Sequence, residues 1–177
     1  MENLTKISKL LSLILRHKPE TIGIGLNENG WADVGALLKA LNEKNYNVNM
    51  DLLERVVSEN NKQRFIFSPD KTKIRANQGH SINIDLGLIP SPPPDILYHG
   101  TATRFLGSIN TQGLLKQSRN HVHLSADIET AQKVGIRHGR PIALLINAKA
   151  MYRDGYLFYI SENNVWLTEH VPAKYFI

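Results

Sequence analysis

The chain has 177 residues, of which 42% are hydrophobic and 21% charged, and it contains no Cys. This composition is typical of a soluble globular protein with a buried core, and the lack of Cys excludes disulfide scaffolds, thiolate zinc sites and cysteine nucleophiles. The formal net charge of +5 favours an anionic partner.

No apolar run in the sequence approaches the ~18 residues that a membrane helix needs. The apolar stretch from Leu10 to Leu15 is too short for a signal peptide, and Arg16 follows it where a small-residue cleavage site would stand. We therefore expect a cytoplasmic protein, which also suits the lack of Cys.

The first expected element is a helix between Leu4 and Leu15, where apolar residues recur at helical spacing. Pro19 limits how far this helix can run, so Arg16 and His17 fall near its last turn.

Two further helices and a hairpin are expected next. Asp33 is a candidate N-cap for the second helix, and Asp51 opens the third. Residues 64–67 and 74–76, on either side of a turn at 68–70, predict a β-hairpin. Three helices followed by a hairpin is the element order of a winged helix, an architecture frequent in nucleic-acid-binding proteins.

Cationic side chains stand at two places in this first part. Arg16, His17 and Lys18 end the first helix, and Lys62 and Arg64 enter the hairpin. If the hairpin folds back onto the helix, these groups could converge on one phosphate, which suits the planar, bidentate guanidinium of Arg. The alternative is that the helix-end cations only complement the helix dipole.

A proline-rich stretch divides the chain, because Pro90 and the three prolines at 92–94 form a stiff extended spacer. We expect a first domain over residues 1–80, a linker over 81–95 and a second domain over 96–177.

The second part alternates short β-rich runs with helical ones, which predicts a mixed α+β domain with a central sheet. Helices are expected over 104–110 and over 128–136, the latter capped by Ser125 or Asp127. The expected strands are 97–99, 121–124, 142–146, 157–160 and 165–167.

The segment from His99 to Arg140 concentrates cationic and imidazole side chains, which indicates an anionic ligand such as a phosphate. A solvated basic surface would give the same charge pattern. The cations are Arg104, Lys116, Arg119, Lys133, Arg137 and Arg140, the histidines are His99, His121, His123 and His138, and the carboxylates are only Asp127 and Glu129.

Common cofactor and metal motifs are missing. The glycines at 23, 25 and 30 have the wrong spacing for a dinucleotide fingerprint, and there is no phosphate-loop lysine motif. His121 and His123 would share one face of a strand, but no further ligand completes a metal set, so we expect no metal and a packing role for one of them.

Three short motifs place polar groups and glycines where elements are expected to end. In residues 98–101 a strand is expected to give way to a turn, where Gly100 lets a ligand approach the backbone closely. Residues 120–125 and 135–139 set imidazoles beside small or hydroxyl residues. Together the three motifs outline a cleft.

In this order the motifs resemble the NAD-dependent RNA 2′-phosphotransferases, over essentially the whole chain. The fold that the resemblance implies is α+β, with an N-terminal winged-helix RNA lobe and a C-terminal ADP-ribosyltransferase-like lobe that binds NAD. The matching segments are 15–19, 30–31, 62–65, 74–80, 98–101, 119–125, 135–139 and 165–168.

The resemblance also implies residue roles. The RNA 2′-phosphate would be gripped, in a cleft between the lobes, by Arg16, His17, Arg64 and Arg119. The NAD pocket would be lined by His99, Gly100, Thr101, His123, Ser125, Arg137, His138 and Gly139.

The implied reaction consumes NAD as a co-substrate and needs no metal. The 2′-phosphate, of the kind left at tRNA splice junctions, attacks the ribose carbon that bears nicotinamide and leaves ADP-ribose on the RNA phosphate. The ribose 2″-hydroxyl then attacks phosphorus, giving 2′-OH RNA and ADP-ribose 1″,2″-cyclic phosphate. The expected partners are NAD and RNA, with the protein a monomer.

Elementary chemistry agrees with this scheme. A phosphate dianion is already a nucleophile, so motifs rich in Arg and poor in carboxylates are sufficient. His17 could protonate the departing RNA oxygen, because an ordinary imidazole titrates near pH 6.5.

Two alternatives remain open. One is an ADP-ribosyltransferase that caps terminal phosphates of nucleic acids, and the other is a winged-helix regulator that binds nucleic acid without catalysis. A protein-modifying transferase is disfavoured, because such enzymes carry a Glu in the last sheet motif, which here is residues 165–167, although Glu162 lies close in sequence.

Overall fold

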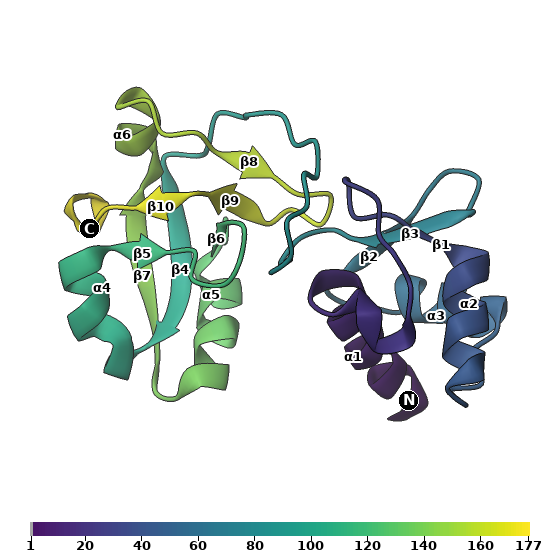
Figure 1. The fold of residues 1–177 in the computed structure, drawn as a ribbon. Coiled ribbons are helices and arrows are strands. Elements are labelled where there is room, and N and C mark those ends of the chain that lie inside the picture. The colour runs from purple at the N-terminus through teal and green to yellow at the C-terminus, as the bar shows by residue number, and fades with distance from the viewer. Residues whose placement is uncertain (1) are drawn as a thin grey trace. The chain divides into compact units, whose positions relative to one another are not determined.

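The computed structural model describes residues 2–177, with side chains from Leu4 onward. The chain divides into two compact units, Met1–Gly87 and Leu88–Ile177 (Figure 1). Over residues 2–177 there is no helix with the length and apolar character needed to cross a membrane.

The first unit combines helices with a small antiparallel sheet of strand order β1-β3-β2. Its elements in chain order are α1 (Glu2–Arg16), η1 (Pro19–Ile22), β1 (Ala32–Asp33), α2 (Val34–Glu43), α3 (Met50–Ser58), β2 (Phe65–Phe67) and β3 (Lys73–Ala76). The three predicted helices and the hairpin are confirmed, and β1 is an addition that the sequence did not suggest.

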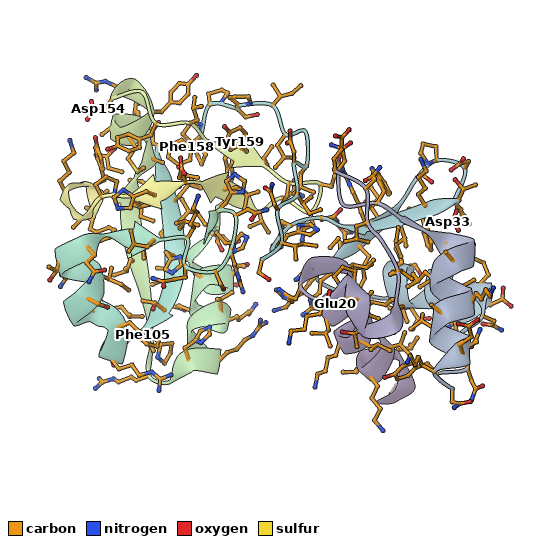
Figure 2. The ribbon with its side chains drawn as sticks, in the orientation of Figure 1. Glu20, Asp33, Phe105, Asp154, Phe158 and Tyr159 are labelled. Carbon is orange, nitrogen blue, oxygen red and sulfur yellow. The ribbon has the colours of Figure 1, made fainter. Side chains whose placement is uncertain are left out.

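Short polar side chains set the helix starts. The Oδ1 of Asp33, labelled in Figure 2, accepts a hydrogen bond from the Ala36 amide at 2.7 Å and caps α2 as predicted. The prediction that Asp51 opens α3 was wrong by one residue, because the helix begins at Met50. Its cap is Asn49, whose Oδ1 accepts from the Leu52 amide at 2.9 Å.

The apolar face of α1 forms the centre of the first core. Leu11, Ile14 and Leu15 have no exposed surface and pack with residues of the other helices and of β3, such as Leu37 and Ile74. Burial of each such side chain contributes about 1.5–3 kcal/mol, so this face fixes the direction of α1. The helix therefore delivers its last residues to a defined position.

The second unit is built on a long strand pair, β4 (Ile96–Ala102) with β7 (Pro141–Asn147), seven residues in antiparallel register. A β-bridge between Tyr98 and Ser125 connects β4 to the end of β6. The remaining strands form the sheets β6-β9-β8 and β10-β5, with β5 (Leu114–Leu115), β6 (Val122–Leu124), β8 (Tyr159–Ile160), β9 (Trp166–Thr168) and β10 (His170–Val171).

Helices cover this framework (Figure 1). The core between them is formed by fully buried side chains that include Leu97, Ile146 and Phe158, the last labelled in Figure 2. The helical elements are η2 (Thr103–Phe105), α4 (Leu106–Gln112), α5 (Ile128–Gly135), η3 (Ile136–His138), α6 (Ala148–Arg153) and η4 (Ala173–Tyr175).

Most predicted elements of this unit are confirmed, with shifted bounds. Of the two candidate caps of α5, Asp127 has the role, and its Oδ1 accepts from the Thr130 amide at 2.7 Å. Helix α6, capped by Asn147, was not predicted. His121 lies just before β6, so the predicted strand over 121–124 begins one residue later, at Val122.

The predicted turn at Gly100 was also wrong, because β4 continues to Ala102. A Cβ at Gly100 would lie 1.7 Å from the backbone oxygen of Ala131 in α5, and one at Gly135 would lie 2.5 Å from the oxygen of Thr101. Both glycines thus let α5 rest directly on the backbone of β4. The missing side chain of Gly100 makes room for a helix, and that space is not open to a ligand.

Candidate functional sites on the two units

The end of α1 is held by a segment that follows β3. The Ser81 amide donates to the backbone oxygen of Arg16 at 2.9 Å, and the Ser81 hydroxyl lies 2.8 Å from His17 Nδ1. Gly79, at φ +88°, lies against the Arg16 guanidinium, because a Cβ built there would be 3.5 Å from Nη1. Segment 77–81 therefore contacts two predicted site residues, Arg16 at the end of α1 and His17 directly after it.

The same segment contacts the main chain at Arg64, at the entry to β2. The Asn77 amide donates to the Arg64 backbone oxygen at 2.9 Å. The Asn77 side chain donates to the oxygen of Gln63, which has a φ of 42°, a left-handed conformation that costs a non-glycine residue about 1–2 kcal/mol. Segment 77–81 thus connects two arginines that are 48 positions apart in the sequence.

The Arg64 side chain is half-buried. Its Nη1 donates to Asn60 Oδ1 at 3.2 Å, and burial lowers the pKa of the guanidinium. Partial burial removes water from the Arg64 guanidinium and so disfavours its charged form. An anionic ligand at this place would replace part of that lost hydration.

His80 lies inside the segment and is only 1% exposed. Its pKa is lowered from 6.5 to about 4, first by burial and then by the positive charges of Arg16, His17 and Arg75. His80 is therefore neutral at pH 7 and lies where the electrostatic potential is positive. We name Arg16, His17 and Arg75, together with the neutral His80 on which their charges act, the cation cluster of the first unit.

The sequence predicts no individual role for two members of this cluster, Arg75 and His80. Arg75 lies 4.6 Å above the Trp31 ring and donates to the backbone oxygen of Leu86 at 3.5 Å. The importance of both residues comes from burial and from neighbours distant in sequence, so neither residue type nor spacing could have identified them.

In the second unit, His99 and His123 are joined directly. His99 Nδ1 lies 2.9 Å from the backbone oxygen of His123. A carbonyl only accepts, so Nδ1 carries the proton and the neutral ring presents Nε2 as an acceptor. Burial is the main cause that lowers the pKa of His99, with Arg119 and His138 lowering it further against the hydrogen bond to His123.

Arg119 joins this pair from the loop between β5 and β6. Its Nη1 lies 2.6 Å from His123 Nδ1. A guanidinium only donates, so Nδ1 of His123 is the acceptor. The side chain is exposed, and nearby protein atoms still lower the pKa of Arg119 by desolvation. The structure therefore connects three predicted site residues in one hydrogen-bonded chain.

The other predicted residues of this unit gather along β4. Ser125 exchanges two backbone hydrogen bonds with Tyr98, at 2.8 and 2.9 Å. Arg137 and His138 are exposed on η3, which follows the point where Gly135 packs against Thr101.

The turn after η3 also returns to β4. Gly139 has a φ of 129°, and a Cβ built there would lie 3.6 Å from the Ala102 side chain. The Thr103 amide donates to the Arg140 oxygen at 3.0 Å. The three motifs at 98–101, 120–125 and 135–139 therefore meet around one strand.

His121 stands apart from this arrangement. Its ring packs at a tilt against Tyr159, with the ring centroids 5.7 Å apart, and burial lowers its pKa. Across residues 2–177 no group of three His, Asp or Glu side chains is placed to hold a metal ion.

Known proteins that resemble this chain carry the same description. The sequence profile of the family described as RNA 2′-phosphotransferase, Tpt1 / KptA family, matches residues 2–170. A probable RNA 2′-phosphotransferase from Acaryochloris marina is 54% identical over 99% of this chain and 97% of its own length. Proteins of the same description from Flavobacterium johnsoniae and Fusobacterium nucleatum are 56% and 53% identical over 98% and 99% of this chain, and over 96% and 98% of their own lengths.

The cation cluster of the first unit and the polar residues along β4 of the second thus lie in a chain that resembles these relatives over almost its whole length. By the profile match and by these identities, the chain belongs to the RNA 2′-phosphotransferase family and is an enzyme of the transferase kind.

Proposed function

We propose that this protein removes a 2′-phosphate from RNA by transferring it to NAD, with 2′-OH RNA, nicotinamide and ADP-ribose 1″,2″-cyclic phosphate as products. The observation that carries the proposal is the cation cluster, where segment 77–81 holds Arg16 and His17 beside a buried, neutral His80. The family membership supplies the substrate class.

We further propose that the first unit is a winged-helix RNA lobe and the second an ADP-ribosyltransferase-like lobe. Three helices with the sheet order β1-β3-β2 support the first assignment, because the hairpin β2-β3 then forms the wing. The paired β4 and β7 covered by α5, with polar motifs along β4, support the second.

Arg16, Arg64 and Arg119 are proposed to bind the oxygens of the RNA 2′-phosphate. Charge on these oxygens increases as phosphorus is attacked, and preorganised donors stabilise it. Desolvation lowers the pKa of both Arg64 and Arg119, so each guanidinium has lost part of its hydration where it is proposed to meet the anion. His17 is proposed to give a proton to the departing RNA oxygen.

The residues along β4 fit a dinucleotide that carries hydroxyl and diphosphate groups. His99 presents an Nε2 acceptor that suits a ribose hydroxyl, because its Nδ1 is occupied by the His123 oxygen. Arg137 and His138 are exposed donors for phosphate oxygens. NAD would supply the ribose carbon that accepts the phosphate, and Thr101, His123, Ser125 and Gly139 complete the proposed set.

The role proposed for Gly100 is different from the one that the sequence suggested. Its missing Cβ accommodates the Ala131 oxygen. Gly100 therefore supports the NAD site by letting α5 approach β4, and α5 in turn places η3 with Arg137 and His138.

The test is to incubate the protein with NAD and an RNA oligonucleotide that carries one internal 2′-phosphate, and to identify every product by mass spectrometry. Dephosphorylated RNA, nicotinamide and the cyclic phosphate in equal amounts are expected. A stable ADP-ribosylated RNA would instead identify a capping transferase, and intact substrates would identify a binding protein without turnover.

A further inference from the structure

Ser81 makes two contacts at the end of α1, one through its backbone amide and one through its side-chain hydroxyl. Its amide donates to the backbone oxygen of Arg16 at 2.9 Å, which fastens the segment to the helix. Its hydroxyl lies 2.8 Å from His17 Nδ1, across 64 positions of sequence. The second contact is made by a side chain to the titratable ring that the proposed reaction uses.

A hydroxyl differs from other partners of an imidazole because it both donates and accepts. When Nδ1 has no proton, the Ser81 hydroxyl donates to it, and when Nδ1 carries a proton, the hydroxyl oxygen accepts. The contact therefore survives both protonation states of His17. His99 is the contrasting case in this chain, because a backbone oxygen fixes its proton on Nδ1.

We infer that Ser81 is a positioning residue that holds the His17 ring in one orientation while a proton moves on and off Nε2. The inference rests on the proposed function, in which His17 protonates the RNA oxygen. Because the Ser81 hydroxyl occupies Nδ1, the proton that His17 exchanges with the substrate passes through Nε2. Ser81 itself does not contact the reacting atoms in this role.

The surroundings of Ser81 favour a clean substitution. The residue is exposed, and its amide bond to the Arg16 oxygen needs no side chain. Ser81→Ala removes only the hydroxyl, and Ser81→Thr keeps it. Ser58→Ala is the matched control, because Ser58 is exposed in the same unit and its hydroxyl donates to backbone oxygens of its own helix.

The first measurement is steady-state turnover of 2′-phosphorylated RNA. Ser81→Ala is expected to lower kcat about tenfold with little change in the KM for RNA or NAD, since one hydrogen bond is lost. Ser81→Thr and Ser58→Ala are expected to stay within about twofold of the parent protein. An unchanged kcat in Ser81→Ala, or a loss that Ser81→Thr does not restore, would overturn the inference.

The second measurement does not depend on activity. Nitrogen-15 NMR of the His17 ring reports the hydrogen bond and proton at each nitrogen. The Nδ1 signal is expected to shift in Ser81→Ala and to return in Ser81→Thr, and identical spectra in all variants would refute the role of Ser81. If the parent protein turned over no RNA, the proposed function would fail, whereas these spectra would still decide whether Ser81 holds His17.

Discussion

Replacement of Gly100 by Ala tests how α5 is held against β4. A Cβ at this position would lie 1.7 Å from the Ala131 oxygen, 2.6 Å from its carbonyl carbon and 3.0 Å from its Cα, all backbone atoms. A carbon and an oxygen need about 3.3 Å, so α5 would have to move by about 1.6 Å.

Such a movement would separate well-packed atoms. Ala131 has no exposed surface, and Gly135 lies against the Thr101 backbone one turn later. Because overpacking by a flexible side chain already costs about 1–3 kcal/mol, a clash with backbone is expected to cost at least about 3 kcal/mol. For a chain of this size the midpoint temperature would fall by about 6–12 °C.

The assay is thermal and urea unfolding followed by the signal of the second unit. Gly107→Ala is the control, because Gly107 lies in α4, has nothing within 4 Å of a built Cβ, and is expected to gain about 0.5–1 kcal/mol in a helix. If Gly100→Ala unfolded within 1 °C of the parent protein, the account of α5 packing on β4 would be wrong.

Three further outcomes are expected. Arg119→Ala and Arg64→Ala should each lower the rate of 2′-phosphate removal about 10²–10³-fold with NAD affinity nearly unchanged, and loss of NAD affinity with full turnover at saturating NAD would contradict the assigned role. The pKa of His80 is lowered from 6.5 to about 4. The stability that the neutral ring contributes is therefore fully present above pH 6.5, and about 3 kcal/mol of it is lost as the pH falls toward 4. Urea unfolding across this pH range should show a smaller loss of stability in His80→Leu than in the parent protein. RNA affinity should fall as salt is added, because phosphate contacts release counterions, and a binding isotherm that does not change between 50 and 200 mM salt would exclude such contacts.

Elements with a strong local signal could be predicted from the sequence. The helical spacing from Leu4 to Leu15 and the caps at Asp33 and Asp127 all act within a few residues, and each is confirmed. The end of β4 could not be predicted in this way. Gly100 resembles a strand breaker locally, and its reason for being glycine is the Ala131 oxygen on a helix 31 residues later.

The residues of the candidate site could likewise be predicted only where the signal is local. The resemblance supplied Arg16, His17, Arg64 and Arg119, whose motifs are local. Ser81 and His80 gain their importance from contacts with the end of α1, more than 60 positions earlier. A serine and a histidine after a glycine carry no such information in a single sequence, because burial and hydrogen bonding are properties of the folded chain.

The electrostatics of His80 connects the fold to the proposed reaction. Arg16, His17 and Arg75 all lower its pKa, so the first unit maintains a positive potential around a buried imidazole that stays neutral. Gathering like charges raises the free energy of the unliganded protein, and a bound phosphate would lower it again by offsetting them. In the rest of the unit, local sequence and fold agree. A single place where the fold gives up stability in this way is typical of a functional site. We therefore propose that the RNA 2′-phosphate binds at the cation cluster and not at the exposed charges elsewhere on the first unit.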